Sequence, residues 1–442
     1  MKSACEVAVL NPEVWATSQR GISLFSQSLI AAVKQAGYSA ALVTDLRPRG
    51  GALEAREIYE QMTRPVKKRS RAIQVVPQFL RHQWSGRAKA VRLAAKGELE
   101  IDHFVNVPDF YDMCRLSGGK PLASPLNVDF LHGMGAKVAL TTAPLAIQAR
   151  RRGVKVIQTV HDLIVLNTDV HGLDRAKFKR RLEACLAHSD AIIAVSEYTR
   201  KEILERYPEC AGRVHVVLQP VPATQSLIEL SGDEDVQREV LEKFGLSRQN
   251  FLFYVGAIEV RKNVARLVAA HGVSQHARDL PLVLAGSVDE GYVASEGLLS
   301  SFFDERGAPT GNSKTGPVRY LGRVTELEKL CLLRAATCFA FPSITEGFGI
   351  PLLEAQSLGC PVLTTNSSAI PEVVGDTAIL IDDPSSVDEI AARLDDMVGD
   401  AALRSRLSAA GLTNSLRFHK DRFAHDIDRV IQSVLPLSNA TT

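Results

Sequence analysis

Short apolar runs rich in β-branched residues alternate along the chain with segments in which apolar residues recur every three or four positions. In the first half, helical periodicity is clearest at 22–35 and 197–206. Strands separated by helices predict βαβ units and a parallel sheet. The runs expected to be strands are 6–10, 41–44, 103–107, 128–131, 155–160, 191–195 and 214–218.

The alternation breaks at 219–235, which is rich in Pro, Ser and acidic residues, and then resumes. A break of this kind is typical of a linker. The sequence therefore predicts an α/β protein of two doubly wound, Rossmann-like domains, 1–230 and 231–442, and 442 residues suit two cores. The expected later strands are 251–255, 282–285, 318–321, 338–341, 362–364 and 378–381, with helices at 326–334, from Gly349, at 387–397 and after Leu416. This final helix is a candidate for packing back across the domains.

Composition places the chain among soluble globular proteins, since 45% of residues are hydrophobic and 23% are charged. A net charge of +2 gives no sign of a nucleic-acid partner. The seven cysteines form no CxxC pair, which argues against a zinc site or a disulfide framework. With no signal peptide and no apolar run of about 18 residues, we expect a cytoplasmic protein.

One tract, 61–97, departs from this balance because it holds ten cationic residues and no acidic one. Phe79, Leu80 and Trp84 are interleaved with the charges. The pattern fits two alternatives: an insertion that docks on an anionic membrane, or a solvated surface insertion. The cations are Arg64, Lys67, Lys68, Arg69, Arg71, Arg81, Arg87, Lys89, Arg92 and Lys96.

The stretch TEGFGIPLLEAQSLG places two glutamates, Glu346 and Glu354, around a glycine-rich entry to a helix. A start near Gly349 or Ile350, with Pro351 in the first turn, leaves Glu346 in the preceding loop and Glu354 one turn inside. The helix N-terminus could then hold a diphosphate while the carboxylates accept sugar hydroxyls. Alternatively, Glu346 complements the helix dipole and Glu354 is solvated.

Two cations follow the first strand of the second domain in the stretch VGAIEVRKN. Arg261 and Lys262 come just before a helix that begins near Asn263. Cations at the carboxyl end of a strand can neutralise ligand phosphates. The alternative is an exposed charged turn in which Asn263 is the N-cap.

The first domain contributes two weaker candidates. His161 directly follows a strand and could bind a ligand hydroxyl or move a proton, although a single His is more often structural. Gly21 opens a helix after the first strand, but the turn has neither GxGxxG nor a P-loop lysine. Rossmann dinucleotide binding and Walker-type hydrolysis are therefore not indicated.

Taken together, these pieces resemble the retaining glycosyltransferases of the GT-B fold, in the large family 4 group (group 1) that includes many bacterial mannosyltransferases. VGAIEVRKN resembles the diphosphate clamp of that family. FPSITEGFGIPLLEAQSLGCPVLTTNSSAIPEVVGDTAIL resembles its donor motif, and TVHDL, IIAVSEYTRKEI and the Gly21 turn match in the first domain. The resemblance covers most of the chain and is strongest over 251–383.

The resemblance implies a role for each matched residue. Arg261 and Lys262 would hold the donor diphosphate and Glu354 the ribose hydroxyls. Glu346 and the backbone of Phe348, Gly349 and Ile350 would meet the donor sugar and phosphate. His161 would face the transferred sugar, and Gly21 would let the backbone approach the phosphates. Many relatives place Arg after the strand-exit Gly where this chain has Ala257, so one expected phosphate contact is absent.

The implied activity is that of a retaining hexosyltransferase, with GDP-mannose as the expected donor of a mannose. The acceptor would be a saccharide, expected to be lipid-linked, in O-antigen or exopolysaccharide synthesis, and the protein could lie peripherally on the inner face of a membrane. Cations and a helix N-terminus would stabilise the leaving phosphate with no metal or other cofactor. The alternatives are a GT-B epimerase or phosphorylase and a non-catalytic nucleotide-sugar sensor.

Overall fold

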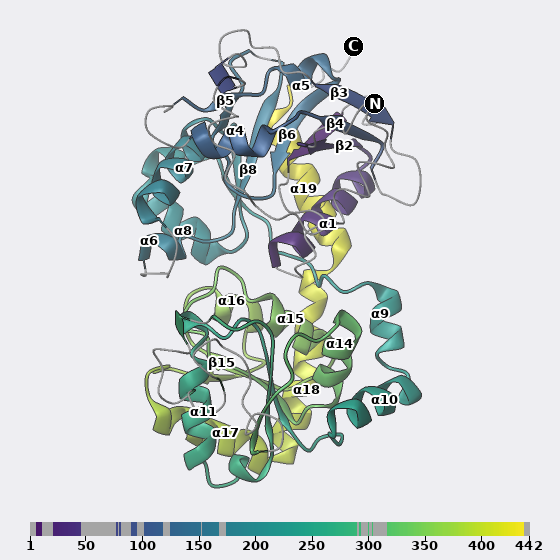
Figure 1. The fold of residues 1–442 in the computed structure, drawn as a ribbon, viewed down its shortest axis with the longest axis vertical. Coiled ribbons are helices and arrows are strands. Elements are labelled where there is room, and N and C mark those ends of the chain that lie inside the picture. Colours follow the sequence, from purple (N-terminus) through teal and green to yellow (C-terminus); the bar gives the residue numbers. More distant parts are fainter. Residues whose placement is uncertain are drawn as a thin grey trace. The chain divides into compact units, whose positions relative to one another are not determined.

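In the computed structural model the chain forms two compact units (Figure 1). Unit 1 comprises Met1–Pro220 and Lys420–Thr442, and unit 2 comprises Val221–His419. The division thus falls at residue 220 rather than 230, and the segment after 419 returns to unit 1. The structure describes residues 6–10, 21–45, 77, 79–80, 90–94, 101–117, 124–151, 153–167, 174–289, 291–292, 299, 303 and 316–436.

The described part of unit 1 is built on an eight-stranded sheet in the order β10-β9-β8-β6-β1-β2-β4-β3. Its pairs are parallel except for β3 with β4. All five residues of β1 are buried, as expected of a central strand covered on both faces. The strands are β1 (Glu6–Leu10), β2 (Ser39–Thr44), β3 (Val91–Ala94), β4 (His103–Asn106), β6 (Ala136–Thr141), β8 (Lys155–Val160), β9 (Ala191–Ala194) and β10 (Val214–Val216). A separate parallel pair joins β5 (Leu126–Asn127) to β7 (Ile147–Gln148).

The prediction of a strand at 128–131 was wrong, because this run begins a short helix and the strand comes later. Asp129 precedes α5 (Phe130–Gly133), and the sheet strand is β6. Val128 and Leu131 are fully buried. A run of four residues with apolar side chains at three positions fits a helical turn as well as a strand, and so the periodicity could not separate the two.

Helix α19 (Lys420–Val434) packs against α1 (Gly21–Gln35), in agreement with the expectation that the final helix crosses back (Figure 1). Its buried face holds Phe423, Ile427 and Ile431, at helical spacing. The other helices of the unit are α4 (Phe110–Ser117), α6 (Ile164–Asn167), α7 (Arg175–Ala187), α8 (Glu197–Arg206) and the 3₁₀ turn η2 (Pro208–Cys210).

Unit 2 contains a six-stranded parallel sheet in the order β13-β12-β11-β14-β15-β16. The strand order reverses between β11 and β14, as in a doubly wound fold. The predicted strands were correct to within a residue or two, because each is a short apolar run bounded by Gly, Pro or polar residues. They are β11 (Leu252–Val255), β12 (Leu282–Ala285), β13 (Val318–Tyr320), β14 (Cys338–Phe341), β15 (Val362–Thr365) and β16 (Ile379–Ile381).

Helices pack on both faces of this sheet (Figure 1). Helix α11 contacts α17, whereas α14 contacts α10 and α15, and α15 contacts α18. The predicted linker 219–235 contains the short helix α9, whose N-terminus is capped by Thr224. The helices are α9 (Gln225–Leu230), α10 (Glu234–Phe244), α11 (Val264–Val273), α14 (Glu326–Ala335), α15 (Ile350–Ser357), α16 (Ile370–Val374), α17 (Val387–Gly399) and α18 (Ala401–Ser415), with 3₁₀ turns η3 (Val260–Lys262), η4 (Ala277–Asp279) and η6 (Leu416–Phe418).

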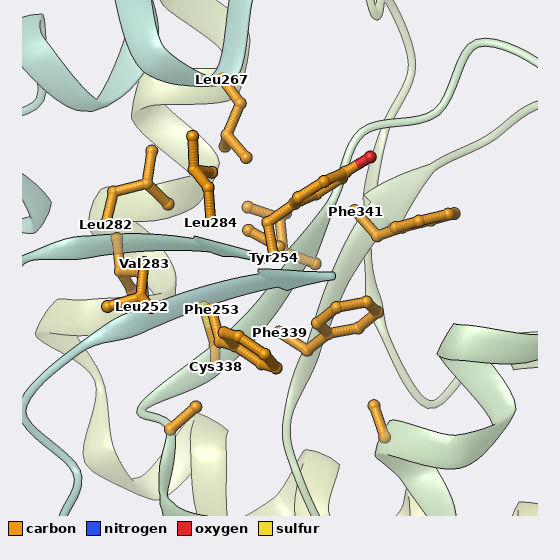
Figure 2. Packing of buried hydrophobic residues seen from close by; sticks show 14 of the residues in the cluster. Leu252, Phe253, Tyr254, Leu267, Leu282, Val283, Leu284, Cys338, Phe339 and Phe341 are labelled. Atoms are coloured by element: carbon orange, nitrogen blue, oxygen red, sulfur yellow. The ribbon is translucent and has the colours of Figure 1, made fainter. Parts of the chain in front are cut away.

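The core of unit 2 is aromatic where β11 and β14 lie side by side (Figure 2). The rings of Tyr254 and Phe341 stack with centroids 5.9 Å apart, and those of Phe339 and Phe341 with centroids 5.5 Å apart. Lys262 brings its Nζ to 4.7 Å from the centroid of the Phe341 ring. The end of this core therefore touches the loop that carries the two predicted cations.

The basic tract 61–97 lies largely outside the described residues. Of its ten cations, Arg92 is described, and it forms an ion pair with Glu6 at 2.5 Å. Phe79, one of the apolar residues considered for membrane docking, is instead buried in the core of unit 1, while Leu80 is exposed. No helix within the described ranges is long and apolar enough to cross a membrane. The six described cysteines are free and buried.

Candidate active site

Two loops of unit 2 meet at the point where the strand order reverses. One loop follows β11 and carries Arg261 and Lys262, and the other follows β14 and carries Glu346. The Ile344 N–H donates to the Arg261 carbonyl oxygen at 2.7 Å, so the two loops are joined by backbone. Ligands of open α/β sheets bind in the crevice at such a reversal.

Lys262 is a buried cation that ends the turn η3, with the following Asn263 in the left-handed conformation at φ 60°. Its Nζ lies 2.5 Å from Oε1 of Glu346, which also accepts from the Ser343 hydroxyl at 2.5 Å. Arg261 reaches the other oxygen, Oε2, with Nη1 at 3.1 Å. The exposed charged turn that we considered for these cations is therefore excluded for Lys262.

The charges of this cluster balance in the structure. Arg261 also places Nε 2.8 Å from Oε1 of Glu259, so two cations face two carboxylates. Burial alone would raise the pKa of Glu346, but Lys262, Arg261 and the Ser343 hydroxyl together hold it below its usual value. Burial lowers the pKa of Lys262. An anionic ligand that binds these cations would therefore replace ion pairs that they already form with Glu259 and Glu346.

Helix α15 begins at Ile350 with Pro351 in its first turn, as predicted. Gly349 is the N-cap at φ 101°. Glycine adopts this positive φ readily because it has no Cβ, whereas other residues rarely do. The first N–H groups of a helix lack intrahelical partners and carry partial positive charge. Phe348 is buried, with its ring centroid 5.8 Å from that of Phe418. The segment from Glu346 to Ile350 is thus held in place and ends in an anion-favouring helix terminus.

Glu354 lies one turn inside α15, and only 2% of its side chain is exposed. A solvated surface position is therefore excluded. Its Oε1 lies 2.6 Å from Nζ of Lys329 on α14, and the same Nζ lies 2.5 Å from Oε1 of Glu326. Burial raises the pKa of Glu354 above its usual value in spite of Lys329.

His161 follows β8 in unit 1, and its Nε2 lies 2.8 Å from the carbonyl oxygen of Thr142. A carbonyl only accepts hydrogen bonds, so Nε2 carries the proton. Burial lowers the pKa of His161 and keeps the ring neutral, which leaves Nδ1 as a hydrogen-bond acceptor. Of the two roles considered, accepting a bond from a ligand hydroxyl fits this tautomer directly.

Gly21 is the first residue of α1, as predicted, and the residues before it lie outside the described ranges. Its proximity to phosphate therefore stays a prediction. Phe25, one turn further along α1, packs edge-on against His161 with centroids 4.9 Å apart. Helix α1, which begins at Gly21, thus contacts His161 through Phe25.

The structure unites some predicted residues and adds others. In unit 2 it brings Arg261, Lys262 and Glu346 into one cluster, while Glu354 joins a second cluster through Lys329. Gly21 and His161 belong to unit 1. The sequence reasoning missed Ser343 and Lys329. Ser343 follows β14 closely, and position at a strand end could have indicated it, whereas nothing local marks Lys329.

Comparisons with known proteins match both units. Residues 20–225 match Glycosyltransferase Family 4, and residues 236–413 match Glycosyl transferases group 1. The chain is 32% identical over 268 residues to O-antigen chain mannosyltransferase B of Escherichia coli, covering 60% of this chain and 66% of that protein. It is 28% identical over 276 residues to the serotype-specific mannosyltransferase WbdA of Escherichia coli, covering 61% of this chain and 32% of that protein. The alignments thus span just under two thirds of the first relative and about one third of the second.

Solved structures share the fold over nearly the whole chain. Sucrose-phosphate synthase from Thermosynechococcus elongatus superposes with a TM-score of 0.63 at 15% identity, covering 97% of this chain and 98% of that chain. Anabaena HepE in complex with UDP and glucose superposes with a TM-score of 0.61 at 14% identity, covering 97% of this chain and 100% of that chain. WaaG, a glycosyltransferase involved in lipopolysaccharide biosynthesis, superposes with a TM-score of 0.56 at 14% identity, covering 96% of this chain and 99% of that chain.

Proposed function

The chain belongs to the glycosyltransferases, in the group 1 and family 4 division with two Rossmann-like domains of the GT-B type, and from that premise we propose that it is a hexosyltransferase. It would move a hexose from a nucleotide diphosphate sugar to a saccharide acceptor. The observation that carries the proposal is the cluster of Arg261, Lys262 and Glu346 at the strand-order reversal, beside the N-terminus of α15.

We propose mannose as the sugar and GDP-mannose as the donor. The support is the similarity to two mannosyltransferases of Escherichia coli, one of them named for the O-antigen chain. The acceptor would be a growing, lipid-linked surface polysaccharide.

The chemistry we propose is departure of the nucleoside diphosphate with retention at the sugar carbon. The bond from that carbon to the β-phosphate oxygen breaks, and the acceptor oxygen bonds to the carbon on the same face. The leaving phosphate takes the acceptor proton. Arg261, Lys262 and the start of α15 would stabilise the charge on the phosphate, while His161 accepts a bond from a sugar hydroxyl. Trapping a glycosyl adduct on Glu346 would contradict this course.

The test is release of nucleoside diphosphate from a panel of GDP- and UDP-sugars in the presence of lipid-linked acceptors. We expect GDP-mannose to be the preferred donor, with activity lost in Glu346→Ala and kept in Glu239→Ala, an exposed glutamate on α10. Binding without release would instead indicate a sensor, and an altered sugar without transfer an epimerase.

We also propose that transfer needs no metal or other cofactor, because protein cations and a helix terminus can balance the charge of the leaving group. Activity should then be unchanged after dialysis against EDTA. A loss that Mg²⁺ or Mn²⁺ restores would contradict this.

Peripheral binding to an anionic membrane through 61–97 is a further part of the proposal, supported by the charge pattern of that tract. The protein should sediment with liposomes that contain anionic lipid at low salt and be released by high salt. Equal recovery with neutral liposomes would remove that support.

A further inference from the structure

Lys329 occupies an unusual place for a lysine, because its ammonium group is held between two carboxylates with 12% of the side chain exposed. Glu326 lies one turn before it on α14, and Glu354 comes from α15. A buried ammonium group costs free energy unless it is paired and hydrogen-bonded. Here the ammonium group donates a hydrogen bond to Glu354 and forms an ion pair with Glu326.

The first turn of α14 is held by a capping box. Thr325 Oγ1 accepts from the Glu328 N–H at 3.2 Å, and Glu328 Oε2 accepts from the Thr325 N–H at 2.7 Å. This arrangement satisfies two of the free donors at a helix start. It fixes the turn from which Glu326 and Lys329 project.

Glu354 is engaged through one oxygen. Its Oε1 accepts from Lys329, whereas Oε2 has no hydrogen-bond partner among the described residues. A carboxylate can accept at both oxygens, so Oε2 is available to a ligand hydroxyl. The hydrogen bond from Lys329 to Oε1 orients the carboxylate, and so it also orients Oε2.

We propose that Lys329 is a positioning residue for donor recognition, which holds Glu354 ionised and oriented so that its second oxygen binds a ribose hydroxyl. The proposal rests on the proposed function, since it needs a nucleotide at this site. Lys329 itself would not touch the reacting atoms. Lys329 acts through its ion pair with Glu354, and Glu326 is the second carboxylate that compensates the charge of the lysine.

The electrostatics of this group agree with that role. Burial raises the pKa of Glu354, Lys329 opposes the rise, and Glu326 adds to it. Burial opposes the charge of Lys329, but Glu354 and Glu326 raise its pKa overall, so the lysine stays protonated. Without Lys329, Glu354 would take up a proton at higher pH. It would then be a poorer acceptor.

The experiment measures the affinity of the full-length protein for GDP, UDP and their 2′-deoxy forms by calorimetry. The wild-type protein should prefer the ribonucleotide by ~10-fold, as expected for a hydrogen bond to a charged group. Lys329→Met should lose most of that preference, and Lys329→Arg should keep part of it. Lys243→Met is the matched control, because Lys243 pairs with Glu328 on the same helix outside this site, and it should leave the preference unchanged.

The pH profile separates positioning from a merely structural role. In Lys329→Met, weakening of ribonucleotide binding on acidification should begin at higher pH than in the wild-type protein. In Glu326→Gln it should begin at lower pH, because the carboxylate that raises the pKa of Glu354 has been removed. If Lys329→Met does not fold, this opposite shift in Glu326→Gln and the result for Lys329→Arg still decide the question.

The possible failures differ in what they overturn. A wild-type protein that binds neither GDP nor UDP would contradict the proposed function, and the role of Lys329 with it. Nucleotide binding without preference for the ribose form would leave the proposed function standing and contradict the role of Glu354 and Lys329. An unchanged preference and pH profile in the Lys329 variants would contradict the role of Lys329 alone.

Discussion

At the scale of single residues, the site in unit 2 depends on a buried lysine whose charge is balanced by one carboxylate. Lys262 is 7% exposed and pairs with Glu346, which is equally buried. A buried ion pair contributes little net stability, but removal of one partner leaves an uncompensated charge away from water. The pair is therefore better explained by binding than by folding.

This reasoning predicts an asymmetric mutant cycle. Glu346→Gln should lower the free energy of unfolding by about 3 kcal/mol, because Lys262 loses its counter-charge. The double variant Glu346→Gln with Lys262→Met should regain part of that loss. Chemical denaturation measures both. Additive losses in the double variant would show that the two side chains do not depend on each other.

His161 predicts a pH effect of known sign. Its pKa is lowered in the folded protein by burial, while an unfolded histidine has a pKa of about 6.5. The unfolded state therefore binds the proton more readily, and stability falls as pH falls below about 6.5. His161→Gln should lose less stability between about pH 7 and pH 5 than the wild-type protein. Because all other histidines are shared, equal slopes for the two proteins would contradict the assignment.

At the scale of elements, the sequence predicted most strands of both sheets and the start of α15, because apolar runs, glycines and a proline such as Pro351 act locally. It did not predict β6, since the apolar run before it proved to be a helical turn. The meeting of Lys262 with Glu346 could be expected from strand order, as both follow central strands. The pairing of Lys329 with Glu354 could not, because it depends on how two helices pack side by side.

The ends of two neighbouring strands of unit 2 lie so close together that one position has no room for a Cβ atom. Gly286 follows β12 at φ 135°, and a Cβ there would lie 1.9 Å from the carbonyl oxygen of Gly256, which follows β11. Gly286→Ala should cost at least about 3 kcal/mol of stability and displace the loop that leads to Arg261 and Lys262, so that nucleotide binding is lost.

A matched control separates the clash from the cost of backbone conformation. Gly245 has φ 61° with no atom within 4 Å of an added Cβ, so Gly245→Ala should cost about 1 kcal/mol and leave nucleotide binding unchanged. Thermal unfolding and calorimetry provide the two measurements. Similar losses in both variants would argue against a steric cause at Gly286.

At the scale of the whole molecule, unit 1 is assembled from two separate parts of the chain. Helix α19 supplies buried side chains to α1, with Phe423 packing on Phe25 at 5.8 Å between ring centroids. Tyr38 donates to Asp428 at 2.6 Å and accepts from Gln432 at 2.7 Å. The first unit is therefore complete only when residues 420–434 have joined it.

This dependence predicts that a cavity in α19 weakens unit 1. Ile427 is fully buried, and Ile427→Ala should cost about 2–5 kcal/mol. Hydrogen–deuterium exchange of backbone amides, followed on peptides from each unit, reports the opening of that unit. Ile390→Ala in α17, equally buried but in unit 2, should leave the exchange of unit 1 peptides unchanged. If Ile390→Ala destabilised unit 1 and Ile427→Ala did not, α19 would not stabilise unit 1.

The return of α19 also sets an order of events during protein synthesis. A ribosome makes the chain from its amino end, and domains generally fold in the order in which they emerge. In this chain all of unit 2 has been made before α19 appears, so the second unit can finish folding first. Until then, the face of α1 that α19 will cover stays open on the nascent chain, and a chaperone that shields apolar surface would have its longest opportunity to bind there.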